Sequence, residues 1–356
     1  MTEEYKIIGA IITAFAIILL AIPSIVTAAR AKGLCEVPDR RRLHKGVIPT
    51  LGGIAIFAAM LIPMFLIHPE TGQSKFVPYL AASTTILFFI GVKDDILLIA
   101  PITKLAGQTI AATILCVFGN IRITDLHGIL GIHELPYIIS IALTIFITIS
   151  TINAFNLIDG VDGLCGLLGI TITTIFSVFF KQEEQWGLCI ASACFVGAVL
   201  GYLRYNLFSK KNKIFMGDTG SQIVGMFCAF LAIEFCELNL SAHPDNKINY
   251  APITAFTIQI VPLFDLLRII FIRMRLGKGI FQPDNNHIHF RLLYLKLSHL
   301  TIDFILVSIT VMFSTIVWIL SNYTSWYRLT MIIILLAMAV FHIPQAIINK
   351  RKSKGK

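Results

Sequence analysis

The sequence predicts an all-α polytopic membrane protein that forms a single transmembrane domain over residues 1–356. It is 56% hydrophobic and 14% charged, whereas soluble domains carry roughly 25% charged residues. Its apolar residues gather in runs of about 17 to 25, long enough for a helix to cross the hydrocarbon core of a bilayer. Its lysines and arginines are distributed unevenly between the loops. These three observations favour a bundle of transmembrane helices.

We expect about eleven spans, because the apolar runs follow one another with short polar joints. The runs cover approximately residues 6–28, 51–68, 77–92, 104–120, 136–152, 164–180, 187–203, 219–238, 251–272, 301–320 and 328–347. The first run follows Glu3 and Glu4 and is about 22 residues long, so we interpret it as a retained helix and not as a cleaved secretory signal. The seven cysteines include no Cys-x-x-Cys pair, so neither a zinc site nor a disulfide framework is predicted.

The basic residues predict the orientation in the membrane. An odd number of spans places the two termini on opposite sides. One side receives the segments 29–50, 93–103, 153–163, 204–218, 273–300 and the basic tail 349–356. With the adjoining helix ends, these hold about 23 of the 29 lysines and arginines, which places them in the cytoplasm and the amino terminus outside. Orientation and attraction to anionic membrane lipid explain the net charge of +9, so we expect no nucleic-acid binding.

Five clusters of polar residues interrupt the apolar sequence, and all five fall on the predicted cytoplasmic side. They are residues 38–53, 93–95, 153–163, 206–221 and 284–291. Ionisable groups at a membrane boundary are costly to desolvate unless they bind something, so five clusters on one side predict an active site there. The opposite side has scattered acids and a predicted small hairpin at residues 121–136, without a cluster whose chemistry we can assign.

The second cluster is a pair of adjacent carboxylates, Asp94 and Asp95, at the end of the third apolar run. Adjacent carboxylates repel each other, and they persist mainly where a divalent cation or a proton transfer uses them. Lys104 follows at the start of the next run. For the pair alone, a solvated helix end with Lys93 as its partner is the alternative interpretation.

The third cluster contains two carboxylates three residues apart, which share one face if the segment is helical. Two glycines beside them allow a ligand to approach the backbone closely. The polar residues and glycines of this cluster are Asn153, Asn156, Asp159, Gly160, Asp162 and Gly163. The spacing indicates a nucleotide site or a phosphate and metal site, and a turn rich in Asp and Asn between two spans is the alternative.

The fourth cluster runs from Asn206 to the sequence FMGDTGS at residues 215–221, which enters the eighth apolar run. Asp218, Thr219 or Ser221 could serve only to cap the helix. The start of a helix also presents free backbone amides, which can hold a phosphate oxygen or a metal-bound carboxylate. Both interpretations fit the sequence at this point.

The last cluster places two imidazoles, His287 and His289, beside Arg291. The arginine is suited to binding a diphosphate. A third nitrogen or sulfur ligand does not follow nearby in the sequence, which argues against a zinc site. We therefore interpret this cluster as a set of phosphate contacts.

The first cluster is a basic loop, and orientation alone could explain its arginines at residues 40–42. Asp39, His44 and Lys45, followed by the turn Pro-Thr-Leu-Gly-Gly that contains Thr50, have more pattern than orientation requires. Carboxylates for Mg²⁺ and cations for phosphate thus gather at one membrane boundary. This combination predicts a membrane enzyme that acts on a soluble diphosphate donor and a lipid phosphate.

These clusters resemble the motifs of the polyprenyl-phosphate N-acetylhexosamine-1-phosphate transferases, or glycosyltransferase family 4. The matching segments are HKGVIPTLGG at 44–53, DD at 94–95, NAFNLIDGVDGL at 153–164, FMGDTGS at 215–221 and HIH at 287–289. The resemblance covers about residues 5–347, and the ordered set is specific although each motif alone is weak. Within the family, the sequence is most similar to the bacterial undecaprenyl-phosphate GlcNAc-1-phosphate transferases.

The resemblance implies transfer of an N-acetylhexosamine 1-phosphate, most readily GlcNAc-1-phosphate, from a UDP-N-acetylhexosamine donor to undecaprenyl phosphate. The products are UMP and a lipid diphosphate sugar that initiates a cell-envelope polysaccharide. The family requires Mg²⁺, for which Mn²⁺ can substitute. The resemblance further implies a multi-pass protein of the bacterial inner membrane, surrounded by membrane lipid, with its active site facing the cytoplasm and with a homodimer as its assembly.

The resemblance also implies roles for individual residues. Asp218 matches the metal-binding aspartate, and Asp94 and Asp95 match a pair assigned to lipid-phosphate activation or metal binding. Asp159 and Asp162 complete the expected catalytic set. Among the expected substrate contacts, His287 and His289 match the motif that holds the donor diphosphate. The full substrate-binding set is Asp39, Lys45, Thr50, Lys104, Asn153, Asn156, Gly160, Asn206, Phe215, His287, His289 and Arg291.

One residue departs from the family pattern, because close relatives often read HIHH where this chain has Phe290. Direct attack by the lipid phosphate and a covalent aspartyl intermediate both fit the motifs. The phospho-MurNAc-pentapeptide translocase is the weaker match within the family, since it has ten spans and lacks the basic tail. A lipid or ion transporter is the alternative from another class, but it should place ionisable groups near the midplane and show internal repeats.

Overall fold

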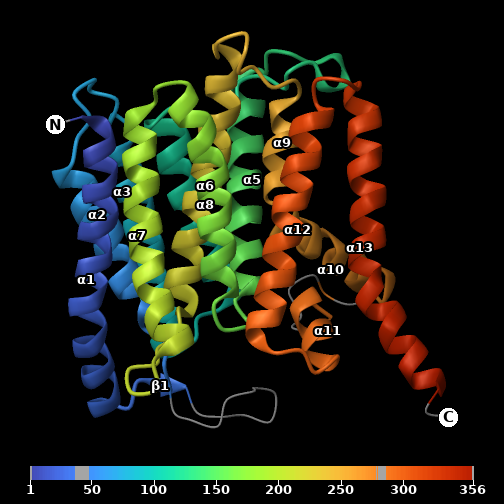
Figure 1. The fold of residues 1–356 in the computed structure, drawn as a ribbon. Coiled ribbons are helices and arrows are strands. Elements are labelled where there is room, and N and C mark those ends of the chain that lie inside the picture. Colours follow the sequence, from blue (N-terminus) through green and yellow to red (C-terminus); the bar gives the residue numbers. More distant parts are fainter. Residues whose placement is uncertain (1, 37–47, 278, 280–285, 355–356) are drawn as a thin grey trace.

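The chain folds into a bundle of helices along one axis, with the two termini at opposite ends (Figure 1). A computed structural model describes residues 2–36, 48–277, 279 and 286–354, apart from the side chains of Glu36, Lys352 and Lys354. The helices along the bundle axis are α1 (Glu3–Ala31), α2 (Gly52–Leu66), α3 (Val77–Leu97), α4 (Pro101–Thr113), α5 (Tyr137–Ile158), α6 (Leu164–Gln182), α7 (Trp186–Phe208), α8 (Gly217–Leu240), α9 (Ala251–Ile258), α12 (His299–Leu320) and α13 (Trp326–Lys354).

Eight helices of the described residues are long and apolar enough to cross a membrane, which confirms the predicted all-α polytopic membrane fold. They are α1, α4 with its π-helical extension Ile114–Phe118, α5, α6, α7, α8, α12 and α13. Each apolar run expected from the sequence coincides with a helix or a helix pair. The number of eleven spans and their orientation stay predictions.

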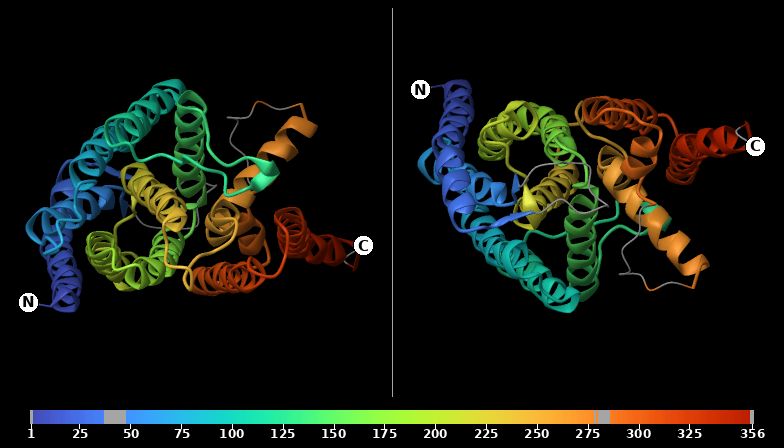
Figure 2. Two further views of the ribbon diagram at one scale, coloured as in Figure 1. Left: turned by 90° about the horizontal axis from the view of Figure 1, so that it is seen from above. Right: turned by 90° about the horizontal axis from the view of Figure 1, so that it is seen from below.

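The ninth expected span, at residues 251–272, is broken, so the prediction of one continuous helix there is wrong. α9 ends at Ile258, and α10 (Ile260–Arg275) begins at an angle of 86° to it. Pro262 explains the break, because it lacks a backbone N–H and its ring clashes with the carbonyl four residues earlier, that of Ile258. Figure 2 shows that α10 leaves the bundle sideways.

Helix α8 lies in the middle of the bundle and is buried along most of its length (Figure 2). It packs against α2, α3, α5, α6 and α9. Glycines allow close approach at its first turn: a Cβ on Gly53 would lie 2.2 Å from the nitrogen of Gly220, and one on Gly91 would lie 2.4 Å from the Cα of Thr219. Helices α2 and α3 are thereby held against the start of α8, which carries Asp218.

One end of the bundle, which we call the polar end, gathers the connections that the sequence analysis singled out. It is the lower end in Figure 1 and contains the last turn of α3, the loops at residues 159–163 and 209–216, and the short helix α11 (Ile288–Tyr294). The two-residue strands β1 (Cys35–Glu36) and β2 (Ile48–Pro49) pair antiparallel there.

The opposite end, which we call the hairpin end, carries the connection at residues 121–136. A bridge between Asp125 and Glu134 closes this connection, and a 3₁₀ turn at Ile129–Gly131 forms its tip. The small hairpin expected from the sequence is therefore confirmed.

Candidate active site

Lys104 holds together three helices at the polar end. Its Nζ donates to Asp94 Oδ2 of α3 at 3.0 Å, to Asp218 Oδ1 of α8 at 2.6 Å and to Asn156 Oδ1 of α5 at 3.1 Å. Asp94 also accepts from the backbone nitrogen of Ile99 at 2.8 Å, and the amide nitrogen of Asn156 donates to Asp218 Oδ1. The structure thus brings one residue from each of three predicted clusters, Asp94, Asn156 and Asp218, into contact with Lys104.

Asp95 points away from Asp94 and caps the amino terminus of α8. Its Oδ1 accepts from the backbone nitrogen of Asp218 at 2.6 Å, and its Oδ2 accepts from the nitrogen and hydroxyl of Thr219 at 3.1 and 2.6 Å. A carboxylate at this position satisfies free helix amides and interacts favourably with the helix dipole. The adjacent pair of aspartates is therefore divided between two tasks, because Asp94 pairs with Lys104 and Asp95 orients the turn that carries Asp218.

Asp159 follows the last residue of α5 and lies within electrostatic range of the other carboxylates. Burial raises its pKa well above the usual value, and the negative charges of Asp218, Asp95 and Asp162 raise it further. The side chain nevertheless keeps part of its surface accessible. Asp95, Asp159 and Asp218 therefore converge on one region, as the sequence predicts, and that region carries an excess of negative charge.

Asp162 is occupied by other partners. Its Oδ2 lies 2.6 Å from Lys213 Nζ and 3.2 Å from His299 Nδ1. Burial opposes the ionisation of this carboxyl, but the hydrogen bonds from His299 and Lys213 outweigh that effect and lower its pKa. Asp162 thus remains charged and ties the loop at residues 159–163 to the loop at residues 209–216 and to α12.

The two predicted histidines face different environments. His287 places Nδ1 2.8 Å from Asp265 Oδ2, and its ring stacks on that of His289 with the centroids 5.6 Å apart. His289 is fully buried against Gly160, where a Cβ would lie 2.5 Å from its Nε2. Burial lowers the pKa of His289 to about 3, so its imidazole is neutral. Within the described part of the chain, neither of its ring nitrogens has a hydrogen-bond partner.

The carboxylate cluster is an open arrangement. Among the described residues, no group of three His, Cys, Asp or Glu side chains could hold a metal ion by itself. Mg²⁺ in enzymes is usually held by one or two carboxylates together with waters and substrate phosphates. The cluster fits that mode, because the side chain of Asp218 is 31% exposed whereas that of Asp94 is 9% exposed.

Thr50 and Phe215 reach the cluster through paired backbone segments. Phe215 donates its nitrogen to Pro49 at 2.8 Å, and its carbonyl accepts from Gly52 at 2.9 Å. This pairing places the carbonyl of Thr50 against Gly217, whose φ of +73° is a conformation that favours glycine. Two other predicted contacts, Asp39 and Lys45, lie outside the described residues.

Two predicted contacts, the buried Asn206 and the half-buried Asn153, form hydrogen bonds beside the cluster. The amide nitrogen of Asn206 donates to the carbonyl of Ile214 at 3.0 Å and so holds the loop at residues 209–216. The amide nitrogen of Asn153 donates to Gln108 Oε1 at 2.8 Å, and Gln108 donates to Gln222 at 3.1 Å. Asn153, Gln108 and Gln222 each lie one helical turn beyond a residue of the cluster, namely Asn156, Lys104 and Asp218. These three amide side chains therefore form a polar layer that supports the cluster.

The structure adds residues that the sequence analysis did not single out. Asp265 and Arg268 of α10 are ion-paired at 2.6 Å and contact the segment that carries the histidines. Both fall inside the run expected to span the membrane, where an ionisable residue is itself a signal of function. Lys213 and His299, the partners of Asp162, were also missed. Arg291 lies half-buried on α11.

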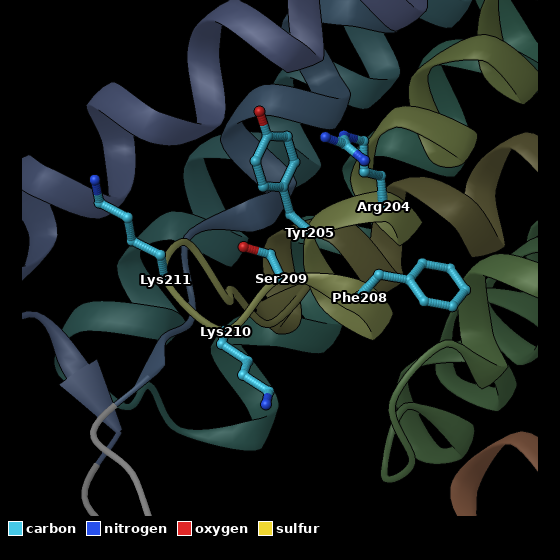
Figure 3. Close-up of a pocket in the computed structure, with 6 residues that line it drawn as sticks. All are labelled: Arg204, Tyr205, Phe208, Ser209, Lys210 and Lys211. Atoms are coloured by element: carbon cyan, nitrogen blue, oxygen red, sulfur yellow. The ribbon is translucent and has the colours of Figure 1, made fainter.

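A separate pocket of about 260 Å³ lies at the polar end of α7 (Figure 3). It is lined by Arg204, Tyr205, Phe208, Ser209, Lys210 and Lys211. Figure 3 shows Lys210 and Lys211 pointing in opposite directions, so their charges do not converge on one ligand. None of the carboxylates described above lines this pocket.

Comparisons with known proteins match this arrangement to one family. Residues 77–236 match the Glycosyl transferase family 4. The chain is 36% identical over 262 residues to the undecaprenyl-phosphate alpha-N-acetylglucosaminyl 1-phosphate transferase of Haemophilus influenzae, which covers 72% of this chain and 71% of that protein. The protein of the same name from Pasteurella multocida is 34% identical, and the match covers 73% of this chain and 71% of that protein. The one from Escherichia coli K12 is 27% identical, and the match covers 88% of this chain and 83% of that protein.

The matched family region contains the residues that meet at Lys104, namely Asp94, Asn156 and Asp218. The similarity to the relatives extends over more than two thirds of each chain. The chain therefore belongs to the polyprenyl-phosphate N-acetylhexosamine-1-phosphate transferases of glycosyl transferase family 4.

Proposed function

We propose that this protein transfers GlcNAc-1-phosphate from UDP-GlcNAc to undecaprenyl phosphate. An oxygen of the lipid phosphate forms a bond to the phosphorus that carries the sugar, and the bridging oxygen of the diphosphate leaves with UMP. The names of the similar proteins support this donor and this acceptor. The observation that carries the proposal is the convergence of Asp94, Asp218 and Asn156 on Lys104, with Asp159 close by.

We propose that Mg²⁺ binds with the donor, and that Asp218 supplies a protein ligand. Four carboxylates converge here, while Lys104 forms ion pairs with only two of them, Asp94 and Asp218. A bound divalent cation would neutralise negative charge on the diphosphate as the phosphoryl group is transferred. Burial raises the pKa of Asp159 most, and the neighbouring carboxylates raise it further; their negative charges support a cation at this place. Mn²⁺ is expected to substitute, because it prefers the same oxygen ligands.

The protein residues contribute positioning and electrostatic stabilisation. Asp95 fixes the first turn of α8 and thereby the direction of Asp218. Lys104 separates the charges of Asp94 and Asp218, which would otherwise repel each other. The neutral ring of His289 is fully buried against Gly160, and among the described residues neither of its nitrogens has a hydrogen-bond partner. A reaction between two phosphates needs such fixed charges, because both substrates are anionic.

We further propose that the polar end faces the cytoplasm of a bacterial inner membrane. The basic loops that join the helices at this end support the orientation through the positive-inside rule. The soluble donor would approach from the cytoplasm, and the lipid phosphate from the inner leaflet. The variant Lys210→Cys tests this orientation: a thiol reagent that does not cross the membrane is added to one side of sealed membranes and then to the other, and its reaction with this cysteine is measured. Labelling from the outer side would contradict it.

The test of the proposed function is a reaction of purified protein with Mg²⁺, undecaprenyl phosphate and UDP-GlcNAc. We expect release of UMP that depends on all three components. A panel of UDP-sugars, including UDP-MurNAc-pentapeptide, determines which donor is used and separates this function from that of the cell-wall translocase. A folded preparation that releases no UMP from any UDP-N-acetylhexosamine would refute the proposal, and transport of lipid or ions by that preparation would support the transporter alternative.

A further inference from the structure

Asp265 lies at the junction between α10 and the histidine segment. It is 2% exposed, and the 86° bend after α9 places it beneath the start of α11. Its Oδ2 lies 2.8 Å from His287 Nδ1, and its Oδ1 accepts from the backbone nitrogen of Ile288 at 3.1 Å. Both carboxylate oxygens therefore hold the first residues of α11.

Arg268 completes this contact from the next turn of α10. Its terminal nitrogen lies 2.6 Å from Asp265 Oδ1 and 2.5 Å from the carbonyl of Asn286. The guanidinium thus neutralises the buried carboxylate and also holds the backbone just before His287. A buried charge is retained at a cost unless it is paired and fully hydrogen-bonded, and Asp265 meets both conditions.

The contact also determines the tautomer of His287. An ionised carboxylate only accepts hydrogen bonds, so Nδ1 of His287 is the donor toward Asp265. The opposite nitrogen, Nε2, is then the atom that the ring can offer to a substrate. A carboxylate behind an imidazole fixes the orientation and the tautomer of the ring.

We propose that Asp265 is a positioning residue for the reaction: it holds His287 in the orientation and tautomer that place Nε2 toward the phosphates of the nucleotide donor. This inference rests on the proposed function, in which the histidine segment contacts the donor. Asp265 itself does not contact the substrate and acts through His287. Arg268 supports Asp265 by balancing its charge and by holding Asn286.

The experiment compares steady-state kinetics of the wild type, Asp265→Asn, His287→Asn and the double variant. We expect Asp265→Asn to lower kcat/KM for the UDP-sugar by about 10- to 100-fold, the usual effect of losing a partner that orients a functional histidine. The KM for undecaprenyl phosphate should stay unchanged. In the His287→Asn background, Asp265→Asn should cause no further loss, because its effect passes through the imidazole. Additive losses, or an equal change in the constants for both substrates, would overturn the proposal.

Loss of folding is controlled by a charge-balanced variant, Asp265→Asn with Arg268→Gln, which leaves no buried charge unpaired. It should show the same donor-specific loss as Asp265→Asn. Hydrogen exchange of residues 286–294 provides a readout that does not need turnover: exchange should be faster in Asp265→Asn than in the wild type. Unchanged exchange would refute the contact itself, whereas a wild-type preparation without turnover would refute the proposed function and leave this measurement valid.

Discussion

The two ends of the bundle hold their acidic side chains in different ways. At the hairpin end, Glu237 of α8 accepts from the backbone nitrogen and the hydroxyl of Thr124, both at 2.7 Å. Each oxygen of that carboxylate has its own neutral donor, and the bonds fasten the hairpin to the bundle. At the polar end, Asp94 and Asp218 share the ammonium group of Lys104, while Asp159 has neighbours of the same charge.

This difference separates a structural acid from a functional one. Each oxygen of Glu237 accepts a hydrogen bond from Thr124 within the fold. Among the described residues, the cluster around Lys104 holds more carboxylates than Lys104 pairs with, and such a surplus is stable mainly when a cation or a proton completes it. The position of an acidic residue at a membrane boundary is therefore a weaker indication of a functional site than a group of carboxylates with too few cationic partners.

The largest effect should come from Asp218→Asn, which removes a carboxylate that is more exposed than its neighbour Asp94. We expect the rate of UMP release to fall by about 10³-fold, because a fixed charge that meets the reacting phosphates is lost. The side chains are isosteric, so membrane insertion should be preserved. Activity equal to that of the wild type, measured at saturating Mg²⁺, would exclude a role for this carboxylate in binding a metal.

Lys104→Gln should have the next largest effect, because it removes the shared partner of Asp94 and Asp218. We expect about a 100-fold loss of activity, together with about 1–3 kcal/mol of destabilisation from leaving polar groups without their charged partner. Thermal unfolding in detergent measures the second quantity. If the variant were as stable as the wild type, the three-helix contact at Lys104 would not be holding the polar end together.

Asp159→Asn should reveal the unbalanced charge directly. A carboxyl whose pKa is raised by folding stabilises the protein fully below its unfolded pKa and loses that contribution as pH rises through its folded pKa. The neutral variant should therefore be more stable than the wild type at pH 7.5 and equally stable near pH 4. Thermal midpoints across this pH range provide the test. The opposite sign at pH 7.5 would show that Asp159 is already stabilised by its surroundings.

Adding Mg²⁺ to the same measurement of thermal midpoints tests whether Asp159 lies close to a bound cation. If a divalent cation completes the polar end, adding Mg²⁺ with UMP should raise the midpoint of the wild type at pH 7.5 more than that of Asp159→Asn. The two proteins should then differ less than they do without the ligands. An equal rise in both would indicate that Asp159 does not sense the bound cation.

The sequence predicted the composition of the site better than its internal contacts. Polar residues are rare in a membrane protein, so Asp94, Asp159 and Asp218 were visible as clusters between apolar runs. The individual partners depend on how distant helices pack. Asp95 caps a helix that begins more than 100 residues later, and Asp162 pairs with Lys213 of another loop. A single sequence contains no local pattern that specifies such pairs.

The bend before α10 shows a different reason for a missed feature. Residues 251–272 are apolar enough on average to be counted as one span, which concealed both Pro262 and the ion pair of Asp265 with Arg268. Each of these residues was a local signal against a continuous helix in lipid. The average hydropathy of a run predicts where a helix forms, whereas the exceptions inside it indicate where the chain turns toward a site.

The smallest effect on catalysis should come from Glu237→Ala at the hairpin end, the matched control for Asp218→Asn on the same helix. The variant removes two hydrogen bonds, so we expect a loss of about 1–3 kcal/mol in stability, with kcat and both KM values unchanged. Thermal unfolding and the UMP-release assay measure the two outcomes on one preparation. A large fall in kcat at a temperature where the variant is folded would mean that the two ends of α8 are coupled, and the distinction between a structural and a functional acid would then not follow from their local partners.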